Sequence, residues 1–188
     1  PAYVGVADID YRPGFVIIHR GQNTLSVVRY FDDADAAPSR PFLVRSDQVT
    51  VATSGDNSDS RGIAFDTTAR DACEQENCVD VAGCEACLDV PVGFYLANRT
   101  PPSLIIGTLE VEPNEEDGVT TSLREVISLD EAIPLPLGPA LVSVGHIVND
   151  FGELAPRVFV VCFDSRFVVV YDPFLRRVEC AHRRDAPR

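Results

Sequence analysis

The chain has 188 residues, of which 45% are hydrophobic, so it is long enough to bury a core and does not have the composition of a disordered tail. Its formal net charge of −13 argues against a phosphate-binding surface, and we expect no nucleic-acid partner. No run approaches the roughly 18 apolar residues needed to span a bilayer, and we expect no direct membrane span.

Residues 1–52 contain the first predicted unit of β-structure. From Phe15, the sequence FVIIHRGQNTLSVVRY carries two apolar runs on either side of a polar turn at 19–23, which is the pattern of a β-hairpin. A strand that starts at Tyr3 precedes this hairpin, and a more polar, alternating strand that starts at Phe42 follows it. Four strands are therefore expected in this unit.

The same order of strands returns over residues 61–130 and 139–182. The second hairpin starts at Phe94, in FYLANRTPPSLIIGTL, and the third starts at Val158, in VFVVCFDSRFVVVYDP. Each hairpin again follows a candidate inner strand and precedes a candidate outer strand. These flanking strands start at Arg61 and Thr121 in the second unit, and at Ala140 and Arg176 in the third.

Three repeated units of four strands, ordered from buried to exposed, predict an all-β fold. This order is typical of a β-propeller blade, so we expect residues 1–188 to form a β-propeller segment of about three four-stranded antiparallel blades. A Cys-rich insertion at 70–91 interrupts the second unit. We expect this insertion to be a surface loop rich in disulfides.

Three of these stretches, FVIIHRGQNTLSVV, RGIAFDTT and FYLANRTPPSLIIGTL, resemble the YncE-like and related YVTN-type β-propellers. Blades of that family carry an aliphatic strand, an Asn-Arg or Asn-Gly turn and a Ser-Val-Ile strand. The resemblance covers most of the chain outside 70–91 and 111–120. It implies a propeller, an architecture that hosts binding modules, scaffolds, lactonases and lyases alike. Because His19, Asn98 and Cys162 occupy the same offset in the three copies, we expect no catalytic turn repeated in every blade.

Three blades do not close a ring, because propellers typically have 4 to 8. The chain also begins with Pro1 instead of Met, so we expect a segment whose remaining blades lie on another chain or a partner subunit. Burying an apolar blade face contributes on the order of 10 kcal/mol, so both end faces are expected to be covered. The residues expected on these faces are Val4, Val6, Phe15, Ile17, Leu25 and Val27 in the first unit, and Phe159, Val161, Phe167, Val169 and Tyr171 in the third.

Four cysteines lie within the insertion, in CEQENCVDVAGCEAC. Four thiolates could hold zinc or an iron–sulfur cluster, but the spacings fit neither the paired CxxC ribbon nor the ferredoxin pattern. Two disulfides that staple a small loop are favoured, as in an oxidising compartment. Nested pairing suits a hairpin-like finger, although four cysteines permit three connectivities. The candidates are Cys73, Cys78, Cys84 and Cys87, and nested pairing joins the outer two and the inner two.

Two further cysteines fall in the third unit, on its second and fourth predicted strands. Cys162 and Cys180 would lie roughly 9 to 10 Å apart there, which exceeds the roughly 7 Å between α-carbons that a disulfide tolerates. We therefore interpret Cys162 as a small buried apolar residue. Cys180 is either free or bonded to a segment outside this chain.

Two acidic turns offer oxygen atoms of the kind that calcium prefers. Asp56, Asn57 and Asp59 lie in SGDNSDSRG, and NDFGE near residue 150 is similar. Neither sequence matches the 12-residue register of an EF-hand. We expect turns in which Asp and Asn cap their own backbone, with calcium at the first turn as the alternative and no other cofactor.

No sequence motif of a known catalytic class is present. Neither a Gly-x-Ser-x-Gly elbow, nor a His-Glu-x-x-His helix, nor a phosphate-binding glycine loop occurs. The propeller resemblance implies that an enzyme would be lactonase- or lyase-like, with its active site completed by blades outside this chain. The residues expected to face the axial channel from the inner strands are Asp8, Asp10, Arg61 and His146.

The function that the sequence favours is a binding or scaffold module within a larger assembly. Loops that vary on a rigid scaffold tend to carry recognition, and the insertions of this chain fall in such loops. The expected disulfides and the propeller resemblance indicate an extracytoplasmic setting, in the periplasm, at a bacterial cell surface or outside the cell. The partners expected are other blades of the same propeller.

Overall fold

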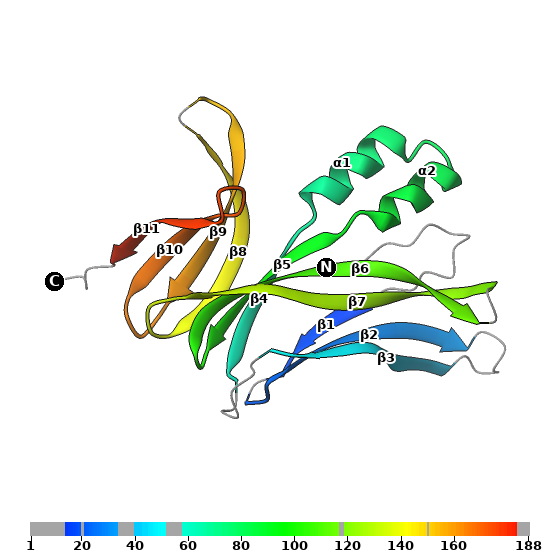
Figure 1. The fold of residues 1–188 in the computed structure, drawn as a ribbon, viewed down its shortest axis with the longest axis horizontal. Coiled ribbons are helices and arrows are strands. Elements are labelled where there is room, and N and C mark those ends of the chain that lie inside the picture. The colour runs from blue at the N-terminus through cyan, green and yellow to red at the C-terminus, as the bar shows by residue number, and fades with distance from the viewer. Residues whose placement is uncertain are drawn as a thin grey trace.

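The computed structural model describes residues 14–19, 21–33, 40–51, 58–116, 119–149 and 151–183. These residues form three antiparallel sheets, which we number I to III in chain order (Figure 1). Sheet I contains β1 (Gly14–Ile18), β2 (Thr24–Asp33) and β3 (Arg40–Thr50); sheet II contains β4 (Ser60–Asp66), β5 (Val92–Arg99), β6 (Pro102–Glu116) and β7 (Val119–Pro134); sheet III contains β8 (Pro139–Val148), β9 (Leu154–Cys162), β10 (Phe167–Asp172) and β11 (Arg177–Arg183).

The antiparallel β-architecture expected from the sequence is confirmed. Each of the three predicted hairpins forms, as β1–β2, β5–β6 and β9–β10. Sheets II and III are four-stranded meanders in which every strand pairs with the next one along the chain. The strand expected from Tyr3 lies outside the described residues, so sheet I is described with three strands.

The sequence predicted a surface loop for the insertion. The structure instead contains a pair of short helices there. Helix α1 (Thr68–Asn77) and helix α2 (Val81–Ala86) are followed by a 3₁₀ turn, η1 (Cys87–Asp89). The run ARDACEQE consists mostly of good helix formers, and the Asp80 carboxylate accepts a hydrogen bond from the Gly83 N–H at 2.8 Å, as an N-cap does. Within the described ranges, no helix has the length and hydropathy that a membrane crossing requires.

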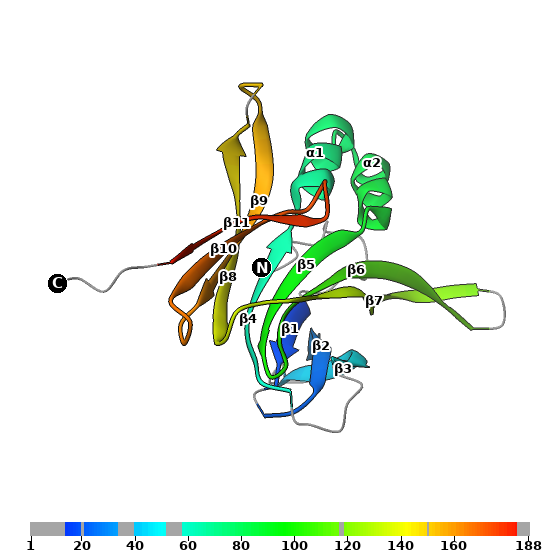
Figure 2. The same cartoon turned by 60° about the vertical axis from the view of Figure 1, so that its left-hand side comes forward.

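Sheet II lies between the other two sheets, and its strand β5 is buried on both faces (Figures 1 and 2). Side chains alternate between the two faces of a strand. Phe94 and Leu96 therefore point into a core shared with sheet I, while Tyr95 and Ala97 point into a core shared with sheet III. A strand covered on both faces carries a continuous apolar run, and VGFYLA is such a run.

The core between sheets I and II is closed by a buried ion pair. Leu25 and Val27 of β2 pack against the Phe94 side of sheet II. Arg29 Nε lies 3.1 Å from Glu125 Oε2, and both side chains are almost fully buried. At the outer edge, the Asp47 carboxylate accepts a hydrogen bond of 2.8 Å from the Ile127 N–H, so a β3 side chain caps a backbone group of β7.

The core between sheets II and III is apolar with aromatic rings at its centre. Tyr95 and Tyr171 meet edge to face, with ring centroids 6.4 Å apart. Burial, with a smaller effect of Asp66, raises the pKa of Tyr95 to about 12, so its hydroxyl stays neutral. Arg99 and Asp164 pair at 2.6 Å at one exposed rim of this interface.

The prediction of which residues lie on the end faces is partly wrong. In the β1–β2 register Phe15 lies opposite Val28, and Val16 lies opposite Val27, so odd residues of β1 share a face with even residues of β2. Phe15 and Ile17 are exposed, as expected, but Leu25 and Val27 lie in the core instead. The same offset in β9–β10 puts Phe167, Val169 and Tyr171 against sheet II, while Phe159 and Val161 occupy the opposite face. Val4 and Val6 lie outside the described residues.

A glycine lets the first strands of sheets II and III approach closely. A Cβ at Gly62 of β4 would lie 2.8 Å from the carbonyl oxygen of Ala140 and 3.3 Å from the α-carbon of Leu141, both in β8. Real Cβ atoms do not come as close as the shorter of these distances. The atom in the way is the backbone carbonyl oxygen of Ala140, which cannot swing aside as a flexible side chain could. Gly62 therefore fixes the spacing between these two strands.

We expect Gly62→Ala to lower the free energy of unfolding by about 1–3 kcal/mol, because the added methyl group forces β4 and β8 apart. The matched control is Gly93→Ala in β5, whose Cβ would make an ordinary contact of 3.7 Å with Asp66. Its effect should stay within about 0.5 kcal/mol. Equilibrium unfolding in urea measures both, and equal losses for the two variants would contradict the close approach.

Candidate functional site

The residues expected to line an axial channel are not brought together by the described part of the chain. Asp8 and Asp10 lie outside it. Arg61 of β4 donates a hydrogen bond of 2.6 Å to the Asp59 carboxylate, so its charge is held within its own segment. His146 is exposed on β8, in register with Pro156. The possibility of an enzyme therefore remains a hypothesis, and the described residues do not include a set of candidate catalytic side chains that lie together.

Of the two acidic turns, the second caps its own backbone, as expected. Asp56 and Asn57 lie outside the described residues, and Asp59 is engaged by Arg61. In the second turn, the Asn149 side-chain oxygen accepts hydrogen bonds of 2.9 Å from two backbone N–H groups, those of Phe151 and Glu153. Among the residues that the structure describes, no group of three or more His, Cys, Asp or Glu is arranged to hold a metal ion.

The turn residue Asn98 has a structural role. Its side-chain oxygen accepts a hydrogen bond of 2.5 Å from the hydroxyl of Ser58, and its amide donates to the carbonyl oxygens of Thr100 and Pro101. At the same offset, His19 contacts the hydroxyl of Ser26 at 3.0 Å. The Asn98 turn is therefore stabilised by its own backbone and by Ser58, and the His19 turn by Ser26.

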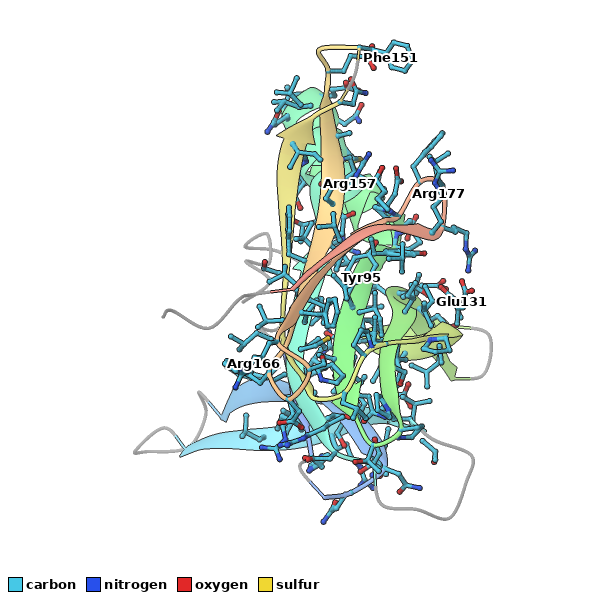
Figure 3. All side chains as sticks on the ribbon, turned by 90° about the vertical axis from the view of Figure 1, so that its left-hand side faces the viewer. Tyr95, Glu131, Phe151, Arg157, Arg166 and Arg177 are labelled. Carbon is cyan, nitrogen blue, oxygen red and sulfur yellow. A yellow bond between two sulfur atoms is a disulfide. The ribbon has the colours of Figure 1, made fainter. Side chains whose placement is uncertain are left out.

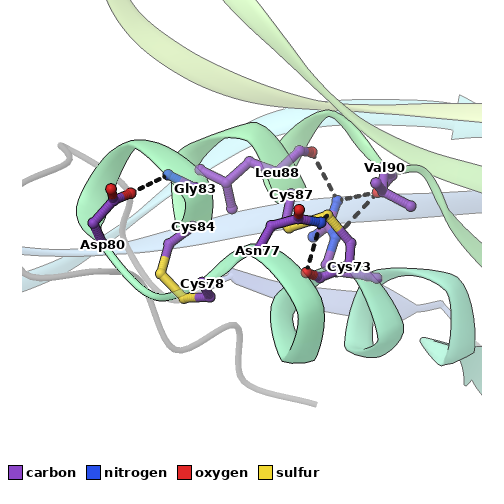
Figure 4. The surroundings of a disulfide bond; sticks show 10 residues. Cys73, Asn77, Cys78, Asp80, Gly83, Cys84, Cys87, Leu88 and Val90 are labelled. Carbon is purple, nitrogen blue, oxygen red and sulfur yellow. Dashed lines mark hydrogen bonds between the residues drawn. A yellow bond between two sulfur atoms is a disulfide. The ribbon is translucent and has the colours of Figure 1, made fainter.

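The four cysteines of the insertion form two disulfides with the nested connectivity (Figure 4). Cys73 pairs with Cys87, and their α-carbons are 5.6 Å apart, so α1 is tied to η1. Cys78 pairs with Cys84, which ties the turn after α1 to α2. The interpretation of these residues as disulfide partners rather than metal ligands is supported.

A buried arginine ties helix α1 to the segment that leads into β5. Arg70 of α1 donates to the carbonyl oxygens of Leu88 and Val90, at 2.9 and 2.6 Å. Leu88 and Cys87 are buried, while most of α1 is exposed. The insertion is therefore a rigid projection that is fixed where it leaves and rejoins the sheet.

Cys162 is the buried small residue that the sequence predicted. It lies in the core between sheets II and III and is not disulfide-bonded. Burial raises the pKa of its thiol to about 11, so the thiol stays protonated and unreactive. In the strand register, Cys162 lies opposite Phe167 whereas Cys180 lies opposite Val170, so their backbones sit in different rows.

A groove of about 670 Å³ lies between the β8–β9 hairpin and the β10–β11 turn. Figure 3 shows Phe151 at the end of the hairpin and Arg177 beside the turn, with Arg157 on β9 between them. Its rim is apolar and strongly exposed, because Phe151 and Phe174 each keep 88% of their surface in solvent and Leu154 keeps 72%. Exposed apolar side chains therefore gather at this end of sheet III.

The floor of the groove is a cluster of charges in which Arg157 and Asp172 are buried and Glu179 is partly exposed. Arg157 Nε and Nη2 donate to the two oxygens of Glu179 at 2.7 and 2.9 Å, and Nη2 also reaches Asp172 at 2.9 Å. The bidentate hydrogen bond to Glu179 and the charge of Asp172 raise the pKa of Arg157. The cluster therefore joins β9, β10 and β11 rigidly beneath the apolar rim.

Sequence reasoning did not find this groove. Phe151 stands alone in a polar turn, and Phe174 follows a strand without any periodic pattern. The residues come together only because the meander places the first and third connections of sheet III at the same end of the sheet. The one usable signal was the exposed phenylalanine within NDFGE, which is uncommon in a solvated turn.

No family model matches the chain, and no curated protein or solved structure matches it either. The class of protein therefore has to be argued from the sheets and the groove alone.

We expect Arg157→Met to lower the free energy of unfolding by about 3 kcal/mol, because Asp172 would remain buried without its cation. The matched control is Arg176→Met, which removes an ion pair with Glu131 whose two side chains are well exposed. That loss should be below about 1 kcal/mol. Denaturant unfolding of both variants measures the difference, and equal values would show that the floor of the groove is not a buried pair.

Proposed function

We propose that this chain is a segment of an exported β-propeller and acts as a binding or scaffold module within a larger assembly. The observation that carries the proposal is the groove in sheet III. It combines an exposed apolar rim with a floor in which Arg157 forms a buried ion pair with Asp172 and a partly exposed one with Glu179. A preorganised surface of this kind favours binding, because little side-chain freedom is lost when a partner docks.

The propeller part of the proposal is supported by the way the sheets stack. The sheets follow chain order and each packs face to face with its neighbour. Sheets II and III are meanders whose first strands, β4 and β8, lie close together. Close approach of β4 and β8 at Gly62 is the contact expected between the inner strands of adjacent blades.

The binding part is supported by where the elaborations lie. The helical insertion joins β4 to β5, and the β8–β9 hairpin is the equivalent connection in the next sheet. Both project from the same side of the stacked sheets (Figures 1 and 2). Connections that are elaborated on one rim of a fixed scaffold are common recognition sites. The two disulfides of the insertion favour an oxidising, extracytoplasmic compartment.

The partner chemistry that suits the groove is a peptide segment with apolar, preferably aromatic, side chains. Phe151, Leu154 and Phe174 offer anchoring contacts, and exposed aromatic residues around a pocket are frequent hot spots. The acidic surface of the chain, with a net charge of −13, favours basic residues on either side of such a segment.

A random-peptide library displayed on phage tests this proposal directly. Panning against the folded chain should enrich peptides with aromatic or aliphatic side chains, and fluorescence anisotropy of a labelled peptide then gives its affinity. We expect the double variant Phe151→Ser/Phe174→Ser to weaken binding by at least about tenfold, because two anchors are lost. Exposed residues tolerate this change, so the fold should persist.

The control is Phe163→Ser, since Phe163 is also exposed but lies in the β9–β10 turn at the other end of β9. Peptide affinity should be unchanged in this variant. Recovery of no peptide, or of peptides that bind the groove variant as tightly as the unchanged chain, would contradict the proposal.

A further inference from the structure

Each sheet of this protein has two distinct faces, which are used in the same way at both internal interfaces. We call the face that carries Phe94 and Leu96 in sheet II its front face, and the face that carries Tyr95 and Ala97 its back face. The front face of sheet II packs on sheet I, and its back face packs on sheet III. The contacts therefore run front to back through the stack.

The sequence repeat maps these faces onto the neighbouring sheets. With the copies aligned at Phe15, Phe94 and Val158, the two front-face positions of β5 correspond to Val158 and Val160 in sheet III, which pack on sheet II. The back-face positions correspond to Val16 and Ile18 in sheet I, which also pack on sheet II. The repeat therefore predicts correctly, at both interfaces, which side chains face the preceding sheet and which face the next one.

The same mapping identifies two faces that have no sheet against them in the described part of the chain. The front face of sheet I carries Phe15 and Ile17, which keep 49% and 38% of their surface exposed, and Leu43 at 59%. The back face of sheet III carries Phe159 and Val161 on β9. Their neighbours across β10 in the register are Val170 and Val168. Both faces are apolar at the positions that form the cores elsewhere. On the back face of sheet III, Val170 keeps only 8% of its surface exposed, and the other three side chains are half-buried.

We propose that the front face of sheet I binds the back face of sheet III of a second copy of this chain. Each open face carries the residue types that its equivalents use inside the chain, and one face is a front and the other a back. Two fronts or two backs do not occur together at either internal interface. The contact is therefore head to tail, and it rests on the stacked-blade arrangement proposed above.

Two copies of the chain give a number of sheets that closed propellers are known to have. A head-to-tail contact generates a closed ring if the rotation between sheets closes, and an open filament if it does not. Two chains of three sheets give six, which lies inside the range of 4 to 8 blades found in closed propellers. Closure by a second copy would remove both open apolar faces from water at once.

The mass of the chain in solution tests the proposal. Light scattering during size-exclusion chromatography should give about 41 kDa, twice the 20.5 kDa of one chain. Phe15→Glu on the front face and Val161→Glu on the back face should each give monomers. Leu43→Glu is a second front-face variant at a more exposed position. Circular dichroism and thermal melts identify any variant that fails to fold.

Mixing the two monomeric variants distinguishes a front-to-back contact from a front-to-front or a back-to-back contact. The Phe15→Glu chain keeps its back face, and the Val161→Glu chain keeps its front face, so the mixture should form a 41 kDa heterodimer through one intact contact. Because one contact is lost, its dissociation constant should be at least about tenfold higher than that of the unchanged dimer. Phe163→Glu, outside both faces, is the control and should stay dimeric.

Three outcomes would overturn the proposal: a monomeric chain at high concentration, a dimer that survives Phe15→Glu or Val161→Glu, or a mixture that stays monomeric. Open oligomers larger than two chains would overturn ring closure by a second copy. Arg157 in the floor of the groove lies on the same face of β9 as Phe159 and Val161. Peptide binding at the groove is therefore measured separately, on the monomeric Phe15→Glu chain, whose sheet III is unchanged. Failure of this inference can therefore be told from failure of the proposed function.

Discussion

The burial of β5 on both of its faces is the constraint on which the rest of the structure depends. Phe94 and Leu96 complete one core, and Tyr95 and Ala97 complete the other, so a single strand of eight residues joins all three sheets. Burying apolar surface stabilises the fold by about 25 cal/mol per Å², so the alternating side chains of β5 stabilise both cores. Neither outer sheet has a second layer in the described part of the chain.

Polar contacts between the sheets act on this apolar stack in different ways. The buried pair of Arg29 and Glu125 fixes the register of sheet I on sheet II, because a slipped register would leave a buried charge unpaired. The exposed pair of Arg176 and Glu131 contributes little by itself. Within sheet III, the pair of Arg157 and Asp172 beneath the groove is also buried, so it fixes β9 relative to β10.

Much of this fold could be read from the sequence, because period-two alternation and turn residues are local signals. All three hairpins were predicted from them, and so were the disulfides. The helices α1 and α2 were missed because the cysteine spacing dominated the interpretation of a segment rich in helix formers. Leu25 and Val27 were assigned to the wrong face of sheet I. In the β1–β2 hairpin, odd-numbered residues of one strand lie opposite even-numbered residues of the other, and alternation within each strand does not reveal this register. The groove needed tertiary structure.

Hydrogen exchange of the backbone amides tests the central role of β5 most directly. If β5 joins both cores, its amides should exchange only when the whole chain unfolds, with a protection free energy equal to the global free energy of unfolding. Amides of the edge strand β11 should exchange much faster, because this edge is covered on fewer sides. Exchange of β5 at the rate of β11, while the rest of the chain remains folded, would contradict the account.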